Sequence, residues 1–534
     1  SYSEILKAPH SSIIFDKELS DRLIEKSKEE GSDAKLVLDE GGQVALVSLT
    51  AKILQIVIAK ASNLVPGGGI WMNTQRPEWN DANNALAGWG LSVVTLCYLH
   101  RMLSFLKDLY KSVSGENFTL PLFIKTAFEE LVALYKKTDA VKAIEDDCER
   151  KNFTDAAGYI FEVERESLYS QGYGKEEGKV TGDQIATALE TIRKIVERTI
   201  TANKRDDGLY HTYNTMIASK DKMKICRLPQ MLEGQVAVLS ADLLKADEVA
   251  SLLAALKASP LYEKRQGSYI LYPNKKLPHF MQKNIVKTED AIATAVLEED
   301  LRGFFHFAPD FRNARILKDY LLSLEDEKRP SDSEVEKLLA LYEKTFNHQN
   351  FTGRSGTFYA YEGLGSIYWH MVSKLLLAVQ ENAVKAFKTG DPCAEKLKVA
   401  YYDVRSGLGF NKEPSLYGAF PFDPYSHTPF GRGAKQPGMT GQVKEEILTR
   451  WGELGVSFAD GRACFNPWLL EGNREMSFTW CGVKVEYARG GQRHISVIRK
   501  DGSIKDYPNS SLSEDETKDL LERNGKIEKI KVTV

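Results

Sequence analysis

The spacing of apolar residues predicts a chain that is helical over most of its length. Apolar positions recur at steps of three and four residues, the pattern of helices with one buried face. The clearest segments are 86–110, 123–135, 182–203, 236–257, 367–387 and 443–451. The stretch 44–65 is more apolar still, but Lys52, Gln55 and Lys60 interrupt it. We therefore expect a buried helix there and not a membrane span.

After about residue 455 the pattern changes to short alternating runs. Residues 463–465, 476–480, 483–487 and 494–499 have the alternation and the flanking Gly and Asn turns that are typical of strands. A charged stretch at 325–337 indicates a solvated helix or an insertion. We expect a mainly α protein, with a helical domain over 1–455 and a small β-rich module over 456–534. An α-solenoid and an (α/α) barrel both fit stacked helices, and aromatic-rich loops favour the barrel.

Composition excludes several classes of partner. Of the 534 residues, 71 are Lys or Arg and 74 are Asp or Glu, so the net charge of −3 gives no general attraction for a polyanion. We expect no nucleic-acid partner and no membrane partner. The six cysteines include no C-x-x-C pair, so neither a metal site nor a disulfide framework is predicted. This cysteine usage favours a reducing compartment, and we expect a cytoplasmic location.

One loop ahead of the helix predicted at 86–110 gathers groups suited to a sugar. It contains Trp71, Arg76, Trp79, Asn80 and Asp81. Aromatic rings stack on sugars, amides bind hydroxyls, and glycosidic cleavage needs a carboxylic acid to protonate the leaving oxygen. The alternative is that an Asp or Asn of this loop is the N-cap of the following helix.

Two further loops lead into predicted helices and carry groups suited to an anion. The loop 354–366 leads to a helix with His370, and the loop 422–439, which contains Arg432, leads to Thr440 and Gly441. Backbone N–H groups at a helix start bind anions. A buried core histidine and an N-cap threonine are the alternatives. No dinucleotide, Walker, H-E-x-x-H or G-x-S-x-G motif is present.

In their order along the chain, these motifs resemble the inverting glycoside phosphorylases of the cellobiose-phosphorylase group. Within it the chain is most similar to the long-chain β-glucan phosphorylases, including those acting on 1,3-linked glucans. Residues 79–81, Trp-Asn-Asp, resemble the motif whose aspartate is the general acid. Residues 362–370 resemble the segment whose glutamate contacts sugar and whose histidine contacts phosphate. Residues 431–433 and 440–441 resemble the segment that holds phosphate, whereas 302–350 has no counterpart in the group.

The resemblance implies reversible, inverting phosphorolysis of β-glucan oligosaccharides to α-glucose 1-phosphate. No cofactor is implied, since inorganic phosphate is a co-substrate. The implied general acid is Asp81, and the implied phosphate ligands are His370, Thr440, Gly441 and Arg432. The sugar contacts that we expect are Trp71, Arg76, Trp79, Asn80, Glu362, Tyr361 and Gln436.

The position of the acid implies that the catalytic domain is incomplete. In this group the acid lies near the middle of an (α/α)6 barrel, whereas here it is residue 81. We therefore expect an incomplete (α/α)6 barrel, with the N-terminal half missing or supplied by a second chain, and a homo-oligomer is left open. Two alternatives remain: an inverting (α/α)6 hydrolase with Glu362, Asp423 or Glu233 as base, and a glucan-binding subunit without catalysis.

Overall fold

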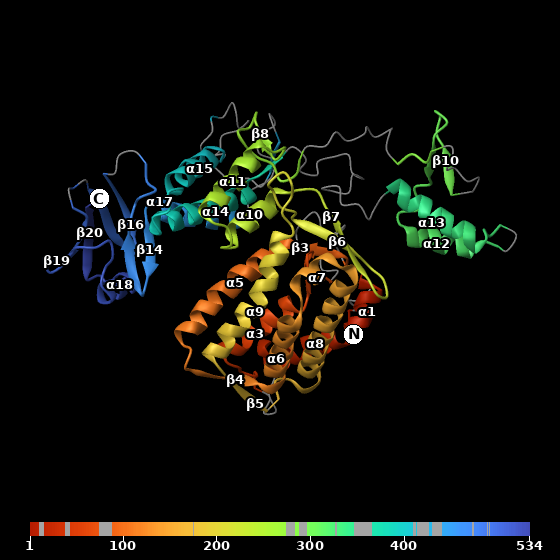
Figure 1. Cartoon of the computed structure of the whole chain (residues 1–534), viewed down its shortest axis with the longest axis horizontal. Coiled ribbons are helices and arrows are strands. Elements are labelled where there is room, and N and C mark those ends of the chain that lie inside the picture. The colour runs from red at the N-terminus through yellow and green to blue at the C-terminus, as the bar shows by residue number, and fades with distance from the viewer. Residues whose placement is uncertain are drawn as a thin grey trace. The chain divides into compact units, whose positions relative to one another are not determined.

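The computed structural model of the chain consists of two compact units. It describes residues 1–9, 15–37, 43–73, 88–174, 176–273, 284–287, 296–325, 328–346, 366–408, 413, 427–429, 440–471, 475–488, 490 and 492–533. The first unit comprises Ser1–Leu243 and Tyr272–Leu364, and the second Leu244–Leu271 and Gly365–Val534 (Figure 1). The domain boundary that we predicted between residues 455 and 456 differs from the boundaries of these two units, and it stays a prediction.

Helices that pack side by side form most of the first unit. α5 packs against α9 and α10, and α6 packs against α3, α8 and α9 (Figure 1). In α9 the buried residues Ile185, Leu189, Ile192 and Val196 follow the helical period, and Thr181 and Gln184 form a capping box at its start. The described helices are α1 (Tyr2–Lys7), α2 (Lys17–Glu30), η2 (Ser32–Lys35), α3 (Leu49–Ala61), α5 (Val93–Ser112), α6 (Leu122–Lys137), α7 (Ala140–Glu145), α8 (Asp147–Gln171), α9 (Gly182–Thr201) and α10 (Leu232–Ser240).

Two antiparallel sheets lie at opposite ends of α5, because this helix follows β3 and leads into β4 (Figure 1). The larger sheet has the order β1-β2-β3-β6-β7, and the smaller pairs β4 with β5. The larger sheet packs around Tyr2, Val65, Trp71, Leu91 and Met216. The strands are β1 (Leu64–Val65), β2 (Gly69–Met72), β3 (Gly90–Ser92), β4 (Asn117–Pro121), β5 (Glu177–Thr181), β6 (Tyr213–Ala218) and β7 (Met223–Arg227).

Three predicted helix boundaries are wrong. The helix predicted at 86–110 starts at Val93, because Ser92 lies in β3 and its side chain accepts a hydrogen bond from the Thr95 N–H as the N-cap. The helix predicted at 236–257 is two helices, since the chain turns at Asp242, whose φ is 57°. The apolar stretch at 44–65 is α3 followed by β1. Among the described residues, no helix combines the length and apolar character needed to cross a membrane.

The region 284–346 has a small core of its own. It contains β10 (Leu297–Glu299), β11 (Phe305–Phe307), α12 (Ala314–Ser323) and α13 (Asp332–Phe346). Leu317 of α12 and Leu338 of α13 are fully buried in one cluster with Phe307 and Tyr342. The charged stretch predicted as a solvated helix or insertion therefore leads into a helix with one packed face.

The second unit contains a helical part centred on α14. This helix packs against α11, α15 and α17. The elements are α11 (Ala246–Ala258), β8 (Tyr262–Glu263), β9 (Ser268–Tyr269), β12 (Ser366–Tyr368), α14 (Trp369–Lys388), α15 (Ala394–Ser406), β13 (His427–Pro429) and α17 (Thr440–Glu453).

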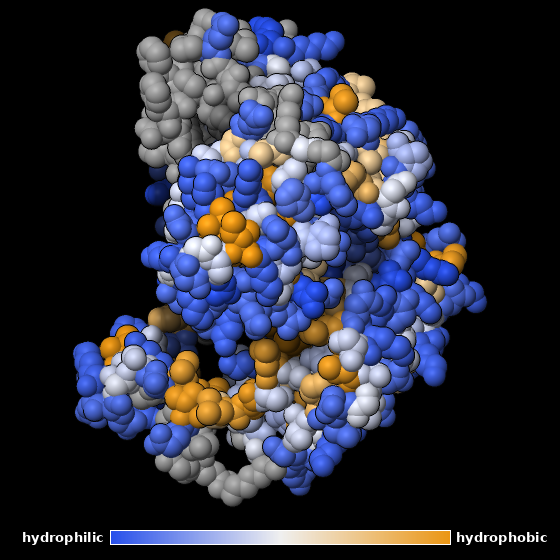
Figure 2. Space-filling view, turned by 90° about the vertical axis from the view of Figure 1, so that its left-hand side faces the viewer, coloured by the Kyte–Doolittle hydropathy of each residue, from blue (hydrophilic) through white to orange (hydrophobic). Residues whose placement is uncertain are grey.

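A β module follows α17, which confirms the prediction of a mainly helical chain ending in a small β-rich region. Its five-stranded sheet has the order β16-β17-β20-β18-β19, and β20 pairs parallel with β17 and antiparallel with β18. Charged and polar residues dominate the face of the molecule shown in Figure 2. The module contains β14 (Val456–Ala459), β15 (Arg462–Phe465), β16 (Met476–Trp480), β17 (Val483–Ala488), β18 (His494–Arg499), β19 (Ile504–Tyr507), α18 (Glu514–Leu521) and β20 (Ile527–Thr533).

The contact between β2 and β3 generates a stability prediction. Gly69 has a φ of +136°, and a Cβ there would lie 2.9 Å from the backbone carbon and oxygen of Ser92. We expect Gly69→Ala to lower the free energy of unfolding by about 1–3 kcal/mol, measured by urea denaturation. Gly115→Ala is the control, since no atom lies within 4 Å of its Cβ position. Equal stability of the two variants would contradict the described pairing.

Candidate active site

The predicted site residues divide into those that the structure describes and those that it does not. Trp71 lies in β2, His370 lies in the first turn of α14, and Thr440 and Gly441 begin α17, for which only the backbone at these two positions is described. The other predicted site residues and two of the alternative bases lie outside the described residues: Arg76, Trp79, Asn80, Asp81, Tyr361, Glu362, Asp423, Arg432 and Gln436.

Trp71 joins the two ends of the segment that contains Asp81. Its indole Nε1 donates a hydrogen bond to the carbonyl oxygen of Gly88 at 2.8 Å. The neighbouring Met72 pairs with Gly90 across β2 and β3, so residues 73 and 88 are held at one edge of the sheet. The Trp71 ring is 4% exposed and packs edge-on against Tyr2 at 6.2 Å. In this structure the indole therefore supports the segment, and its sugar contact stays a prediction.

The structure also rejects one alternative for this segment. The N-cap of α5 is Ser92. No Asp or Asn between residues 76 and 84 therefore caps that helix, and the carboxyl group of Asp81 is not needed for this structural role.

A buried hydrogen-bond network holds the turn that precedes Trp71. The three successive carbonyl oxygens at 66–68 accept hydrogen bonds from Arg150 Nε at 2.9 Å, Asn203 Nδ2 at 3.2 Å and Asn214 Nδ2 at 2.7 Å. The Thr199 hydroxyl accepts the N–H of residue 67 at 3.3 Å. Because buried backbone groups are costly to leave unpaired, these side chains fix the path of the turn. The sequence analysis missed them, since their partners lie far away in the sequence.

Glu233, one of the alternative bases, lies in the first turn of α10. The hydroxyl of Tyr213 on β6 donates a hydrogen bond to its Oε2 at 2.8 Å. The larger sheet therefore positions both this carboxylate and Trp71, within the first unit.

In the second unit, α14 and α17 run in the same direction. His370 near the start of α14 lies beside Glu445 near the start of α17, with 3.9 Å between Nε2 and Oε2. Further along, Gln380 Nε2 of α14 donates to the carbonyl oxygen of Thr449 at 2.7 Å. The N-terminal ends of the two helices therefore lie at the same end of the pair, and the first-turn N–H groups of both are oriented to that end.

His370 is buried and uncharged at neutral pH. It is 8% exposed, and its Nδ1 lies 3.3 Å from the hydroxyl of Tyr368. Burial, followed by the charges of Lys374 and Lys444, lowers the pKa of His370 to about 4. The imidazole can therefore donate or accept a hydrogen bond, and it gains a positive charge only when a nearby anion compensates for the cost of burial.

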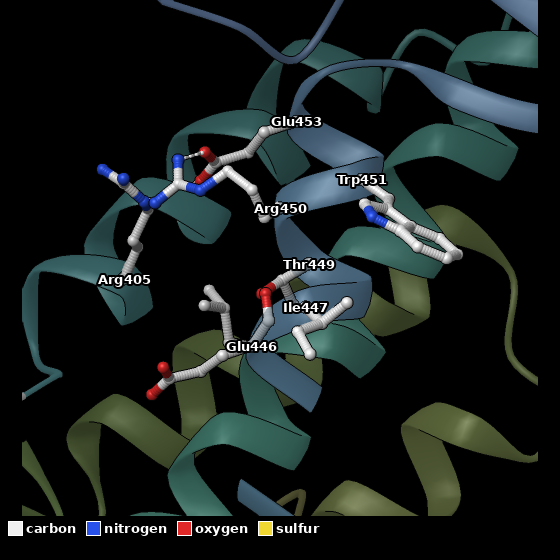
Figure 3. Close-up of a pocket in the computed structure, with 8 residues that line it drawn as sticks. Arg405, Glu446, Ile447, Thr449, Arg450, Trp451 and Glu453 are labelled. Atoms are coloured by element: carbon white, nitrogen blue, oxygen red, sulfur yellow. Dashed lines mark hydrogen bonds and ion pairs between the residues drawn. The ribbon is translucent and has the colours of Figure 1, made fainter. Parts of the chain in front are cut away.

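The opposite half of α17 lines an open pocket of about 450 Å³ (Figure 3). Glu453 is 3% exposed there, and its carboxylate binds Arg450, Arg405 Nε at 2.6 Å and the Tyr401 hydroxyl at 2.7 Å. These contacts occupy both carboxylate oxygens, so the cluster ties α15 to α17. The described residues that line the pocket include no predicted site residue; they are Leu376, Arg405, Glu446, Ile447, Thr449, Arg450, Trp451 and Glu453.

The described residues contain no group of three His, Cys, Asp or Glu side chains arranged to hold a metal ion. The predictions that the protein needs no metal and no cofactor stay predictions.

Comparison with known families gives a match in the first unit. Residues 277–349 match the family described as GH149 phosphorylase insertion domain 2. No curated protein sequence matches the chain. The matched region overlaps the segment 302–350, for which the sequence resemblance offered no counterpart, and it contains α12 and α13. The match supports a glycoside phosphorylase family for this chain.

The Trp71 hydrogen bond can be tested directly. We expect Trp71→Phe to lower the free energy of unfolding by about 1–3 kcal/mol, because the buried Gly88 carbonyl loses its donor. Trp468→Phe is the matched control, since its Nε1 donates to the exposed Glu395 at 3.2 Å and water can replace it. Urea denaturation measures both variants, and an unchanged free energy of unfolding for Trp71→Phe would show that the bond to Gly88 does not stabilise the fold.

Proposed function

We propose that the protein is an inverting phosphorylase of β-glucan oligosaccharides, with 1,3-linked glucans as the preferred class. It cleaves the terminal glycosidic bond with inorganic phosphate and releases α-glucose 1-phosphate, and the reaction is reversible. The observation that carries the proposal is the match of residues 277–349 to a phosphorylase insertion domain. The linkage and the inverting course come from the resemblance of residues 79–81, 362–370 and 431–441 to the β-glucan phosphorylases.

The paired starts of α14 and α17 support a phosphate site. His370 lies in the first turn of one helix, and Thr440 and Gly441 begin the other. First-turn N–H groups and the positive ends of two helix dipoles favour an anion at the same end of the pair. We assign His370, Thr440 and Gly441 to phosphate, with Arg432 as a further ligand.

Phosphate replaces the second carboxylate that a hydrolase would need. In an inverting hydrolase a base activates water on the face of the sugar opposite the acid. Phosphate is already anionic, so the site has only to bind it and aim it at the anomeric carbon. Asp81 is the proposed general acid: it protonates the leaving oxygen and must itself be protonated before the reaction.

The remaining assignments complete the proposed enzyme. Trp71, Arg76, Trp79 and Asn80 bind sugar with Asp81, and Tyr361, Glu362 and Gln436 contribute from the other loops. No cofactor is needed in this scheme. We also propose that the rest of an (α/α)6 barrel comes from a missing N-terminal half or a second chain, and that the enzyme acts in the cytoplasm.

Replacing the acid gives the first functional prediction. We expect Asp81→Asn to lower kcat by at least about 100-fold with the fold intact, because general acid catalysis contributes factors of about 10²–10⁴. The assay follows glucose 1-phosphate from short β-glucans of defined linkage, using natively purified enzyme so that any partner chain is retained. Asp16→Asn, at the N-cap of α2, is the control for a charge change outside the site. Activity of Asp81→Asn close to that of the wild type would refute the assignment.

Replacing the proposed phosphate ligands gives the second functional prediction. We expect His370→Ala and Thr440→Ala each to raise the KM for phosphate about 10-fold or more, because a hydrogen bond to a charged group contributes about 1.5–3 kcal/mol. The KM for the glucan should change much less. An unchanged KM for phosphate in both variants would assign these residues a structural role.

The products separate this proposal from the hydrolase alternative. Phosphorolysis requires phosphate and yields sugar phosphate. Free reducing sugar formed without phosphate would instead favour Glu233, Glu362 or Asp423 as a base. Glucan binding without any product would favour the binding subunit.

A further inference from the structure

Glu445 is a buried carboxylate placed against His370. Its side chain is 5% exposed, and Oε2 lies 3.9 Å from His370 Nε2, which is within ion-pair range but too long for a hydrogen bond. Within the described part of the chain, Oε2 has no hydrogen-bond partner. The other oxygen lies 3.5 Å from Nζ of Lys444, whose side chain is largely exposed. Burying a carboxylate with so few hydrogen bonds raises the free energy of the folded protein. A proton shared with the imidazole would lower this free energy.

The charges around His370 come from three elements. Lys374 belongs to α14, Lys444 and Glu445 belong to α17, and the Tyr368 hydroxyl comes from β12. On α11 and α15, Lys257 pairs with Asp403 at 2.5 Å and Arg405 pairs with Glu453 at 2.6 Å. Glu445 lies within ion-pair distance of this imidazole.

Nε2 of His370 faces Glu445 and Nδ1 faces the Tyr368 hydroxyl, so a phosphate bound at the Nδ1 side would have the carboxylate on the opposite side of the ring. Two anions on either side of a neutral ring repel each other, and the low dielectric of a buried site strengthens the repulsion. An imidazolium between them converts the repulsion into two attractive contacts. Because the two groups are so close, the added proton belongs to the pair and not to either residue alone.

We propose that His370 and Glu445 form a proton-binding pair, and that phosphate binds here with the uptake of one proton by this pair. The inference rests on the proposed function, since it assumes that His370 is a phosphate ligand. Glu445 is thus a positioning residue: it acts on phosphate through the orientation and charge of His370.

The sign of the pH dependence follows from this linkage. In the free protein the imidazole lacks the proton at neutral pH, because burial lowers the pKa of His370 to about 4. In the complex it holds the proton. The affinity for a dianion should therefore fall as the pH rises above this value, by up to about tenfold per pH unit, until the pair in the complex also loses its proton.

Titration calorimetry with sulfate tests the proposal on natively purified enzyme. Sulfate, unlike phosphate, does not titrate near neutral pH, so any proton that is taken up must bind to the protein. Titrations in two buffers with different ionisation heats count the protons. We expect the wild type to take up close to one proton and Glu445→Gln to take up almost none, with an affinity for sulfate that no longer falls with pH. Phosphate itself is titrated in parallel as the natural ligand.

Two further variants control for the change of charge and for a failure to fold. Glu446→Gln makes the same change at the next residue of α17, which lines the pocket of Figure 3, and should behave as the wild type does. Glu445→Asp retains an ionisable group and should retain the proton uptake if Glu445→Gln fails to fold. Urea denaturation monitors the fold of each variant.

The outcomes distinguish the two proposals. Sulfate and phosphate binding to the wild type without proton uptake, or uptake that is unchanged in Glu445→Gln, would overturn the proton-binding pair and leave the phosphorylase proposal standing. The absence of any sulfate or phosphate binding to the wild type would overturn both.

Discussion

The close, same-direction packing of α14 and α17 is the constraint on which the proposed phosphate site depends. Gly452 makes this approach possible, since a Cβ there would lie 2.1 Å from Gln380 Oε1. Gln380 is buried and donates to the carbonyl oxygen of Thr449, so it cannot simply move aside. With the helices fixed in this way, the start of α14 and the start of α17 lie at one end. Two helix dipoles then act on the same region, which neither helix could provide alone.

In the first unit, side-chain hydrogen bonds and strand pairing hold the two ends of the segment that contains Asp81. The turn at 66–68 is held by Arg150, Asn203 and Asn214, and β2 then pairs with β3. Trp71 adds a hydrogen bond to Gly88, on the far side of the segment that contains Asp81. The structure therefore fixes residues 73 and 88, the two ends of the segment that contains the proposed general acid.

The hydrophobic pattern predicted the positions of most helices, but it did not predict the buried face of α17 or the start of α5. In α17 the apolar residues Ile447 and Trp451 are 48% and 40% exposed, whereas Glu445 and Glu453 are 4% and 3% exposed. The helix was predictable from its periodicity, but its buried face was not, because that face is polar and its partners belong to α14 and α15. The helix start at Val93 was missed for a related reason: Ser92 is both a strand residue and the N-cap.

By itself, the sequence determined the mainly helical class, the β-rich C-terminal region and the motifs that resemble a phosphorylase, since these depend on periodicity, turn residues and short local patterns. The tertiary structure alone decided which residues meet. It placed β20, the last strand of the chain, between β17 and β18, and it brought Glu445 to within 3.9 Å of His370 across 75 residues of sequence. Such contacts arise when distant elements pack together, and no local pattern encodes the partner of a side chain that is buried only after the chain has folded.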